Sequence, residues 1–73
     1  MIRLTWKDEW GGRAKATRDV EVAGEAELAG EILRFGEEMT KQKDLILVQG
    51  GSKTFRIYAG DRLCGYVRVR NLG

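Results

Sequence analysis

The chain has 73 residues, of which 33% are charged and 42% are hydrophobic, and its formal net charge is +2. This length and this balance predict a single soluble globular domain, residues 1–73, and argue against a disordered tail or a membrane-spanning segment. With no histidine and one cysteine, the chain offers neither a histidine-activated nucleophile nor a set of zinc ligands, so we expect no enzymatic activity, no cofactor and no metal site.

Alternating apolar and polar residues predict a first strand over residues 1–10, and a similar pattern predicts a second strand over residues 14–22. The Gly-Gly pair between them indicates a turn. A two-residue turn would set acidic side chains opposite Leu4 and Ile2 on the core face, so we expect a loop that is one residue longer, or a bulge. The expected pairs are then Ile2 with Val22, Leu4 with Val20, Trp6 with Arg18, and Trp10 with Ala14.

Residues 25–41 predict one helix, because apolar residues recur there at helical spacing. Glutamates near its start and lysines near its end match the charge preference of the helix dipole. Gly36 lies on the apolar stripe, where a glycine costs about 1 kcal/mol relative to alanine, so we expect it to allow close contact between helix and sheet. The stripe consists of Ala29, Ile32, Leu33, Gly36 and Met39, with Leu28 and Phe35 at its flanks.

The C-terminal half predicts three more strands. They span residues 45–49, 54–59 and 63–70. The pair Gly50-Gly51 between the first two indicates a hairpin with a two-residue turn. In that register Ile46 and Val48 face the core, whereas Leu45 and Leu47 face the opposite side of the sheet.

A three-residue loop is expected between the last two strands, and it predicts their register. The expected pairs are Phe55 with Val67, Arg56 with Tyr66, Ile57 with Gly65, Tyr58 with Cys64, and Ala59 with Leu63. Gly65 would then leave an empty place in the core layer, with room for the helix or for a large neighbouring side chain.

The element order β-β-α-β-β-β predicts an α+β two-layer sandwich, with one helix packed on a mostly antiparallel sheet. A second topology fits the same order. The N-terminal hairpin, the helix that starts near residue 25 and the length of the chain resemble the ubiquitin-like β-grasp, in which the last strand runs parallel to the first. The chain ends in Asn71-Leu72-Gly73 rather than in the Gly-Gly tail of the protein modifiers of that family, so conjugation to other proteins is not supported.

The sheet face that the helix leaves uncovered is the expected binding surface, because it must face solvent or a partner. Positive charge also gathers towards the C-terminus, where residues 52–73 carry five basic groups and one acidic group. The candidate binding residues on this face are Leu45, Leu47, Arg56, Tyr58, Tyr66, Arg68 and Arg70, and the N-terminal hairpin adds Arg3, Thr5, Lys7, Lys15 and Thr17. Trp10 at the hairpin tip is a further candidate anchor, unless it folds over Ala14 and caps the core.

These residues favour a protein-binding module, since tyrosine and arginine are enriched at interface hot spots and leucines add apolar area. One alternative is nucleic-acid binding by the basic, tyrosine-bearing sheet, although Leu45 and Leu47 have no obvious role against phosphates. Another is a homodimer in which two such faces pack together. A plain solvated face remains the simplest alternative.

The chain also resembles, in its general style, the short accessory proteins of actinobacterial phages. The shared features are an aromatic N-terminal hairpin, a glutamate-rich helix and an arginine-rich β C-terminus with several glycines. This resemblance implies a small inhibitor or modulator of a host protein. A lone Cys64 allows no internal disulfide, so we expect a reducing, cytoplasmic location, which is the host cytoplasm for a phage-encoded protein.

Overall fold

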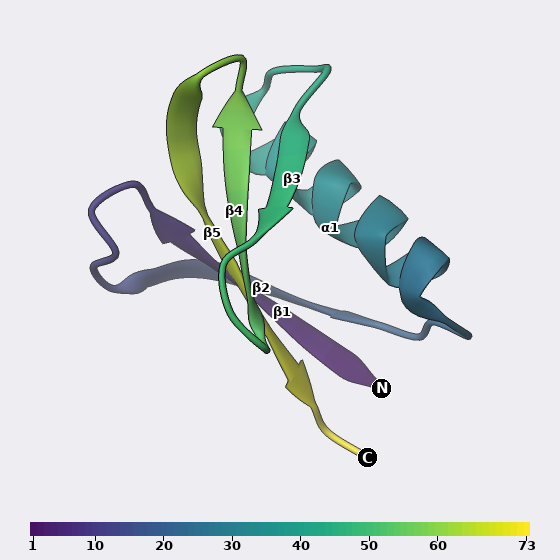
Figure 1. The fold of residues 1–73 in the computed structure, drawn as a ribbon. Coiled ribbons are helices and arrows are strands. Elements are labelled where there is room, and N and C mark those ends of the chain that lie inside the picture. Colours follow the sequence, from purple (N-terminus) through teal and green to yellow (C-terminus); the bar gives the residue numbers. More distant parts are fainter.

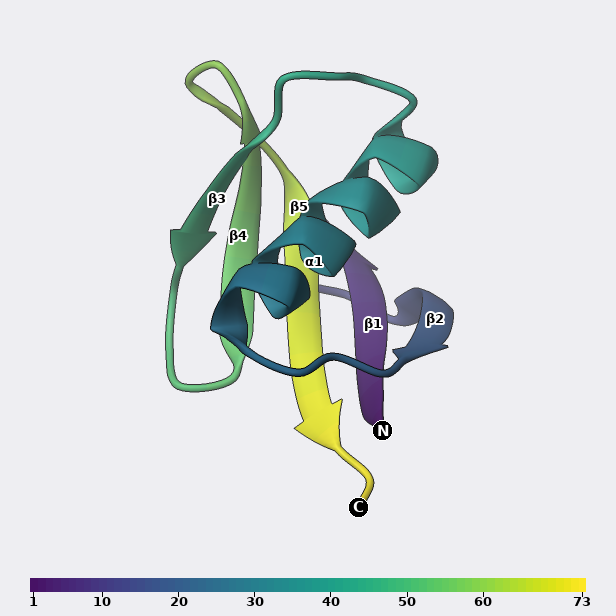
Figure 2. The same ribbon diagram turned by 90° about the vertical axis from the view of Figure 1, so that its right-hand side faces the viewer.

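A computed structural model describes residues 1–73 and shows one helix packed on a five-stranded antiparallel sheet (Figure 1). The elements are β1 (Ile2–Asp8), β2 (Ala14–Val20), α1 (Glu25–Thr40), β3 (Ile46–Gln49), β4 (Thr54–Ala59) and β5 (Arg62–Asn71). The helix crosses one face of the sheet and leaves the other face uncovered (Figure 2). This is the α+β two-layer sandwich that the sequence predicts.

The strand order in the sheet is β2-β1-β5-β4-β3, and every neighbouring pair is antiparallel. The chain therefore folds as two hairpin-connected groups of strands that meet where β1 pairs with β5. Because β1 and β5 run antiparallel, the β-grasp topology, in which the first and last strands are parallel, is wrong for this chain. The sheet has two free edges, β2 and β3.

The buried core lies between the helix and the three inner strands, β1, β5 and β4. It consists of Leu4, Trp6, Ile32, Phe35, Ile57 and Val67. The ring of Trp6 meets the ring of Phe35 edge to face, with centroids 6.3 Å apart. A Cβ atom at Gly65 would lie 2.5 Å from Cζ2 of Trp6 and 2.6 Å from the carbonyl oxygen of Lys7. The empty place that the sequence predicts at Gly65 is thus filled by the indole of Trp6.

The helix begins at Glu25, as predicted, and ends at Thr40, one residue before the predicted end. Lys41 follows in the left-handed region with φ of 59°, and its N–H donates to the carbonyl oxygen of Glu37. The close contact with the sheet predicted at Gly36 is confirmed, because a Cβ atom there would lie 3.4 Å from Cγ2 of Ile57 on β4 and 3.7 Å from Cζ3 of Trp6 on β1. Phe35, expected at the flank of the apolar stripe, is buried.

The register predicted for the first hairpin is wrong by two residues. Ile2 pairs with Val20, and a bulge follows Trp6. Two hydrogen bonds explain the longer loop, because the carboxylate of Asp8 accepts the N–H groups of Trp10 at 3.1 Å and of Gly12 at 3.3 Å. The expected pair of Trp10 with Ala14 does not form, since Trp10 lies in the loop. From Ile2 to Trp6 the shift of two keeps each side chain on its predicted face. Beyond the bulge the prediction is wrong, because Ala14 pairs with Lys7 and Lys15 is left as the extra residue.

The register predicted for β3 and β4 is also wrong, and here the error reverses the faces. The N–H of Gly50 donates to the carbonyl oxygen of Thr54, so the loop holds three residues instead of two. Leu47 consequently pairs with Ile57 and packs against the core, as does Leu45. The opposite side receives Ile46, which is 49% exposed, and Val48, which is 41% exposed.

The predicted register of β4 with β5 is confirmed over most of its length. Phe55 pairs with Val67, Arg56 with Tyr66, and Ile57 with Gly65. A bulge then makes Cys64 an extra residue, so Tyr58 pairs with Leu63 and Ala59 with Arg62. The expected pair of Tyr58 with Cys64 is therefore wrong by one residue.

Candidate functional site

The side of the sheet away from the helix is the candidate binding surface, and we call it the open face. Directly paired residues share a face, so the observed registers define its members. They are Arg3, Thr5 and Lys7 of β1, Ala14, Thr17 and Asp19 of β2, Ile46 and Val48 of β3, Thr54, Arg56 and Tyr58 of β4, and Leu63, Tyr66, Arg68 and Arg70 of β5.

Most of the binding residues predicted from the sequence come together on this face. Arg56, Tyr58, Tyr66, Arg68 and Arg70 all lie on it, on the adjacent strands β4 and β5. Leu45 and Leu47 do not, because the three-residue hairpin loop turns their side chains towards the helix. Their place on the open face is taken by two residues that the sequence assigned to the core, Ile46 and Val48.

A shallow cavity of about 400 Å³ lies over β1 and β5, and most of its lining is positively charged. We call it the basic hollow. Its lining residues are Arg3, Thr5, Lys7, Lys53, Arg68, Val69 and Arg70. Lys53 enters from the loop between β3 and β4, where the N–H of Val69 donates to its carbonyl oxygen at 2.8 Å. Sequence reasoning missed Lys53 as a site residue because it placed this lysine opposite Val48 in a regular hairpin.

One carboxylate faces these cations. Asp19 binds Arg3 through two hydrogen bonds, Nε to Oδ1 at 2.8 Å and Nη2 to Oδ2 at 3.2 Å. This contact lowers the pKa of Asp19 below its ordinary value and raises the pKa of Arg3, in both cases chiefly through the side-chain hydrogen bond. No other residue of the open face is acidic. The other four cations of the hollow form no ion pair within the protein.

The register places like charges side by side in the hollow. Arg3 lies directly opposite Arg70. Arg68, two residues before Arg70 on the same strand, lies opposite Thr5 and faces the same side of the sheet. Like charges at directly opposed positions destabilise a sheet. The hollow thus concentrates positive charge at a cost in stability, which is a common feature of functional sites.

Aromatic and apolar side chains adjoin the hollow on the side of β4 and β3. Tyr66 is paired with Lys7 on one strand and with Arg56 on the other, so it has a cationic residue as its neighbour on each side. Further out, Tyr58 is paired with Ile46, and Val48 with Arg56. The open face thus changes from basic at its centre to mixed aromatic and apolar at the β3 edge.

Trp10 is the most isolated of the predicted candidates. Its side chain is 82% exposed in the loop between β1 and β2, where the N–H of Gly11 donates to the carbonyl oxygen of Asp8. The alternative that Trp10 folds over Ala14 and caps the core is wrong. An exposed indole on a short, hydrogen-bonded loop can act as an anchor for a partner.

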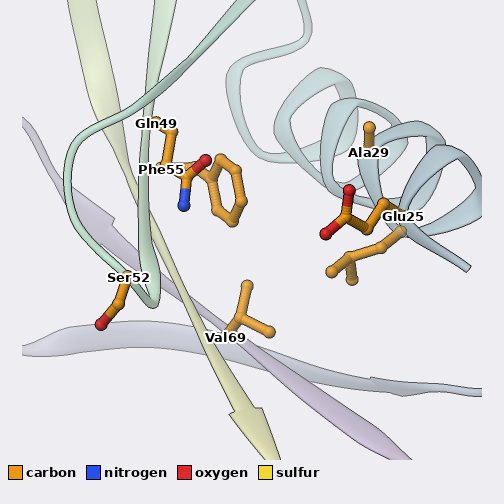
Figure 3. Close-up of a pocket in the computed structure, with 7 residues that line it drawn as sticks. Glu25, Ala29, Gln49, Ser52, Phe55 and Val69 are labelled. Carbon is orange, nitrogen blue, oxygen red and sulfur yellow. The ribbon is translucent and has the colours of Figure 1, made fainter.

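A second cavity, of about 310 Å³, opens on the helix side of the sheet and contains none of the predicted site residues. Its lining residues are Glu25, Leu28, Ala29, Gln49, Ser52, Phe55 and Val69. Phe55 and Val69 point into it from the sheet, and the carboxylate of Glu25 approaches from the helix (Figure 3). The amide of Gln49 is engaged with the carbonyl oxygen of Gly51 at 3.0 Å. This cavity offers an apolar surface with a single charge.

The helix α1 has neither the length nor the apolar character needed to cross a membrane. No family model, no curated protein and no solved structure matches the chain.

Proposed function

We propose that this protein is a non-enzymatic binding module that holds a single-stranded nucleic acid on the open face of its sheet. The observation that supports this proposal best is the basic hollow, where Arg3, Lys7, Lys53, Arg68 and Arg70 surround one cavity. Arginine and lysine clustered in this way are the electrostatic signature of phosphate binding. The helix side of the molecule is acidic, which orients the open face towards a polyanion.

Tyrosine beside the hollow favours a nucleic acid over a simple anion. Tyr66 lies on the same face as Arg68 and between two further cations, so a base can stack on its ring while the adjacent phosphates meet arginines. Sheet surfaces that bind nucleic acid use aromatic residues in this way. Bases are free to stack on a flat sheet only when they are not paired, so we expect preference for a single strand over a duplex.

Leucines on the open face would disfavour phosphate binding, because aliphatic side chains offer a phosphate no favourable interaction. Leu45 and Leu47 face the helix, so they no longer stand against phosphate binding. The apolar residues that replace them, Ile46 and Val48, lie on the edge strand β3, with β4 between them and β5. The open-face side chains that line the basic hollow are therefore arginines, lysines and a threonine, and the one aliphatic residue of the lining, Val69, packs against the core.

The first prediction concerns salt. Fluorescence anisotropy with a labelled oligothymidine should show an affinity that falls steeply with NaCl concentration. Four phosphate contacts predict roughly a fifty-fold loss of affinity between about 50 and 200 mM salt, because the logarithmic slope for single strands is about −0.7 per contact. An affinity that does not change over this range would contradict the proposal.

A charge reversal tests whether the nucleic acid contacts the basic hollow. Arg70→Glu should weaken binding by at least about tenfold at 100 mM salt, because the new carboxylate removes one cation from the hollow and pairs with Arg3 opposite. Arg34→Glu on the helix is the matched control, since it changes the net charge equally at an exposed side chain outside the open face. Equal losses in the two variants would show a nonspecific charge effect and would count against the hollow.

Docking to another protein is a second candidate, and the exposure of Trp10 favours it. On this alternative the protein inhibits or modulates a partner, as the sequence suggested. A pull-down from source-cell lysate, split into nuclease-treated and untreated halves, separates the two. Protein that stays bound after nuclease, and is lost with Trp10→Ala but not with Arg70→Glu, would replace the nucleic-acid proposal.

A further inference from the structure

The two free edges of the sheet are built differently. The edge strand β2 carries Lys15, Arg18 and Asp19, and charged side chains on an edge discourage pairing with other strands. The other edge strand, β3, has the sequence Ile-Leu-Val-Gln, with no charge, no proline and no bulge. Its two β-branched side chains, Ile46 and Val48, are about half exposed. Such an edge is a template for a further strand.

The backbone of β3 has hydrogen-bonding groups that point away from the sheet. In an antiparallel pair, alternate residues direct their N–H and C=O groups to the partner strand. The N–H of Gly50 donates to Thr54 at 2.9 Å, so Gly50, Val48 and Ile46 are the residues that face β4. Leu47 and Gln49 therefore present their backbone groups at the free edge.

We propose that β3 pairs antiparallel with β3 of a second copy of the chain, about a two-fold axis perpendicular to the sheet. The central pair is Leu47 with Leu47 of the second copy. In this register Ile46 of each copy lies opposite Val48 of the other, so every exposed aliphatic side chain of the edge meets another one. The neighbouring symmetric register, centred on Val48, would place Ile46 opposite Gly50 and leave it uncovered.

A second copy fits this edge for two reasons. The edge is self-complementary in shape and charge, since an uncharged four-residue strand pairs with its own sequence. The basic hollows are also far apart in the pair, because three strands, β5, β4 and β3, lie on each side of the axis. Six strand spacings of about 4.8 Å separate the two hollows by roughly 29 Å, which is several times the Debye length of about 8 Å at physiological salt.

The resulting ten-stranded sheet has both open faces on the same side, because the two-fold axis is perpendicular to the sheet. The pairing does not depend on the proposed function, but it gives that function a second site on one continuous surface. The contact between two such short strands is smaller than the about 1,200 Å² of a stable interface. We therefore expect a concentration-dependent equilibrium between monomer and dimer.

Sedimentation equilibrium without nucleic acid tests the pairing separately from the proposed function. The wild-type mass should rise from 8.2 kDa towards twice that value as the concentration increases. Val48→Lys should remain monomeric, because it places a charge on the paired edge. Thr17→Lys on β2 is the matched control and should dimerise like the wild type. A wild-type chain that stays monomeric at millimolar concentration, a Val48→Lys chain that dimerises, or a Thr17→Lys chain that does not, would each overturn the proposal.

Disulfide crosslinking between single cysteines, introduced in a Cys64→Ser background, shows which residues of the two β3 strands lie opposite each other. Directly opposed residues that are not hydrogen-bonded lie about 4.5 Å apart between Cα atoms, which a disulfide can bridge. Mixing the Ile46→Cys and Val48→Cys variants under mild oxidation should give the mixed disulfide dimer. Neither variant should crosslink with itself. A homodimer of Val48→Cys would show the other register, and no crosslink at all would contradict the edge pairing.

Discussion

The two faces of this sheet use positive charge in opposite ways. On the helix side, the guanidinium of Arg18 lies 5.0 Å from the centre of the Phe35 ring and forms an ion pair with Glu38. On the open face, Arg3 has one carboxylate partner, and the Arg70 that lies opposite it has none. The same sheet thus carries a paired arginine on its helix side and an arginine without an ion-pair partner on its open face.

The residues that stabilise the fold and the residues proposed to bind a ligand therefore lie on opposite faces of the sheet. The helix side holds the whole buried core and has no buried polar side chain without a partner. The open face adds little apolar burial, so its residues can change with small effects on folding. Substitutions on the helix side should therefore change mainly stability, and substitutions on the open face should change mainly binding.

The largest expected effect is on stability, at Gly65. In Gly65→Ala the new methyl group would overlap the indole of Trp6 and the backbone carbonyl of Lys7, and the backbone cannot move aside without disturbing the β1–β5 pairing. We expect a loss of about 3 kcal/mol in the free energy of unfolding, measured by urea denaturation. Gly30→Ala is the control, since nothing lies within 4 Å of its Cβ position, and it should stabilise the helix by about 0.5–1 kcal/mol.

A smaller effect is expected on binding, at Tyr66. Tyr66→Leu keeps an apolar side chain beside Lys7 and Arg56 but removes the stacking surface. Affinity for oligothymidine should fall about tenfold, corresponding to about 1.4 kcal/mol, while the salt dependence stays unchanged because no phosphate contact is lost. Tyr58→Leu, further towards the β3 edge, should have the weaker effect. A larger loss at Tyr58 than at Tyr66 would move the binding site away from the basic hollow.

The smallest effect, and one of opposite sign, is expected at Asp19. Asp19→Asn releases Arg3 from its only carboxylate partner, so affinity for the oligonucleotide should increase several-fold. Because folding lowers the pKa of Asp19, its ionised form stabilises the folded chain at neutral pH, and that contribution disappears as the pH falls through the lowered pKa. Thermal unfolding should therefore show Asp19→Asn below the wild type at pH 7 and equal to it in strong acid. A variant that binds more weakly would contradict the role given to Arg3.

The sequence predicts the fold well because its hydrophobic periods are clear. The helix and all five strands follow from alternation, helical spacing and glycine turns. Turn length was harder to predict, since Gly50-Gly51 is compatible with two loops. One observation could have resolved it, because the two-residue turn would have placed Lys53 on the core face. Asp8 could likewise have indicated the longer first loop, since aspartate before a turn accepts backbone N–H groups.

The candidate site was predictable in part. Arginines and tyrosines on β4 and β5 follow from the strand period and from a register that the structure confirms. The basic hollow could not be predicted in this way, because it depends on the pairing of β1 with β5. That pairing brings Arg3 beside Arg70, which lies near the other end of the chain. No local pattern encodes that contact. Val48 takes the place predicted for Leu47 on the open face because the loop between β3 and β4 holds three residues instead of two.

The most direct test of this account is an NMR titration of the 15N-labelled protein with oligothymidine, following backbone amides and arginine side-chain Nε–H groups. The account predicts that the largest shifts occur on β1 and β5, with the side chains of Arg3, Arg68 and Arg70 affected and the helix largely unchanged. Shifts confined to the Trp10 loop or to the helix, or no shifts at all at low salt, would contradict it.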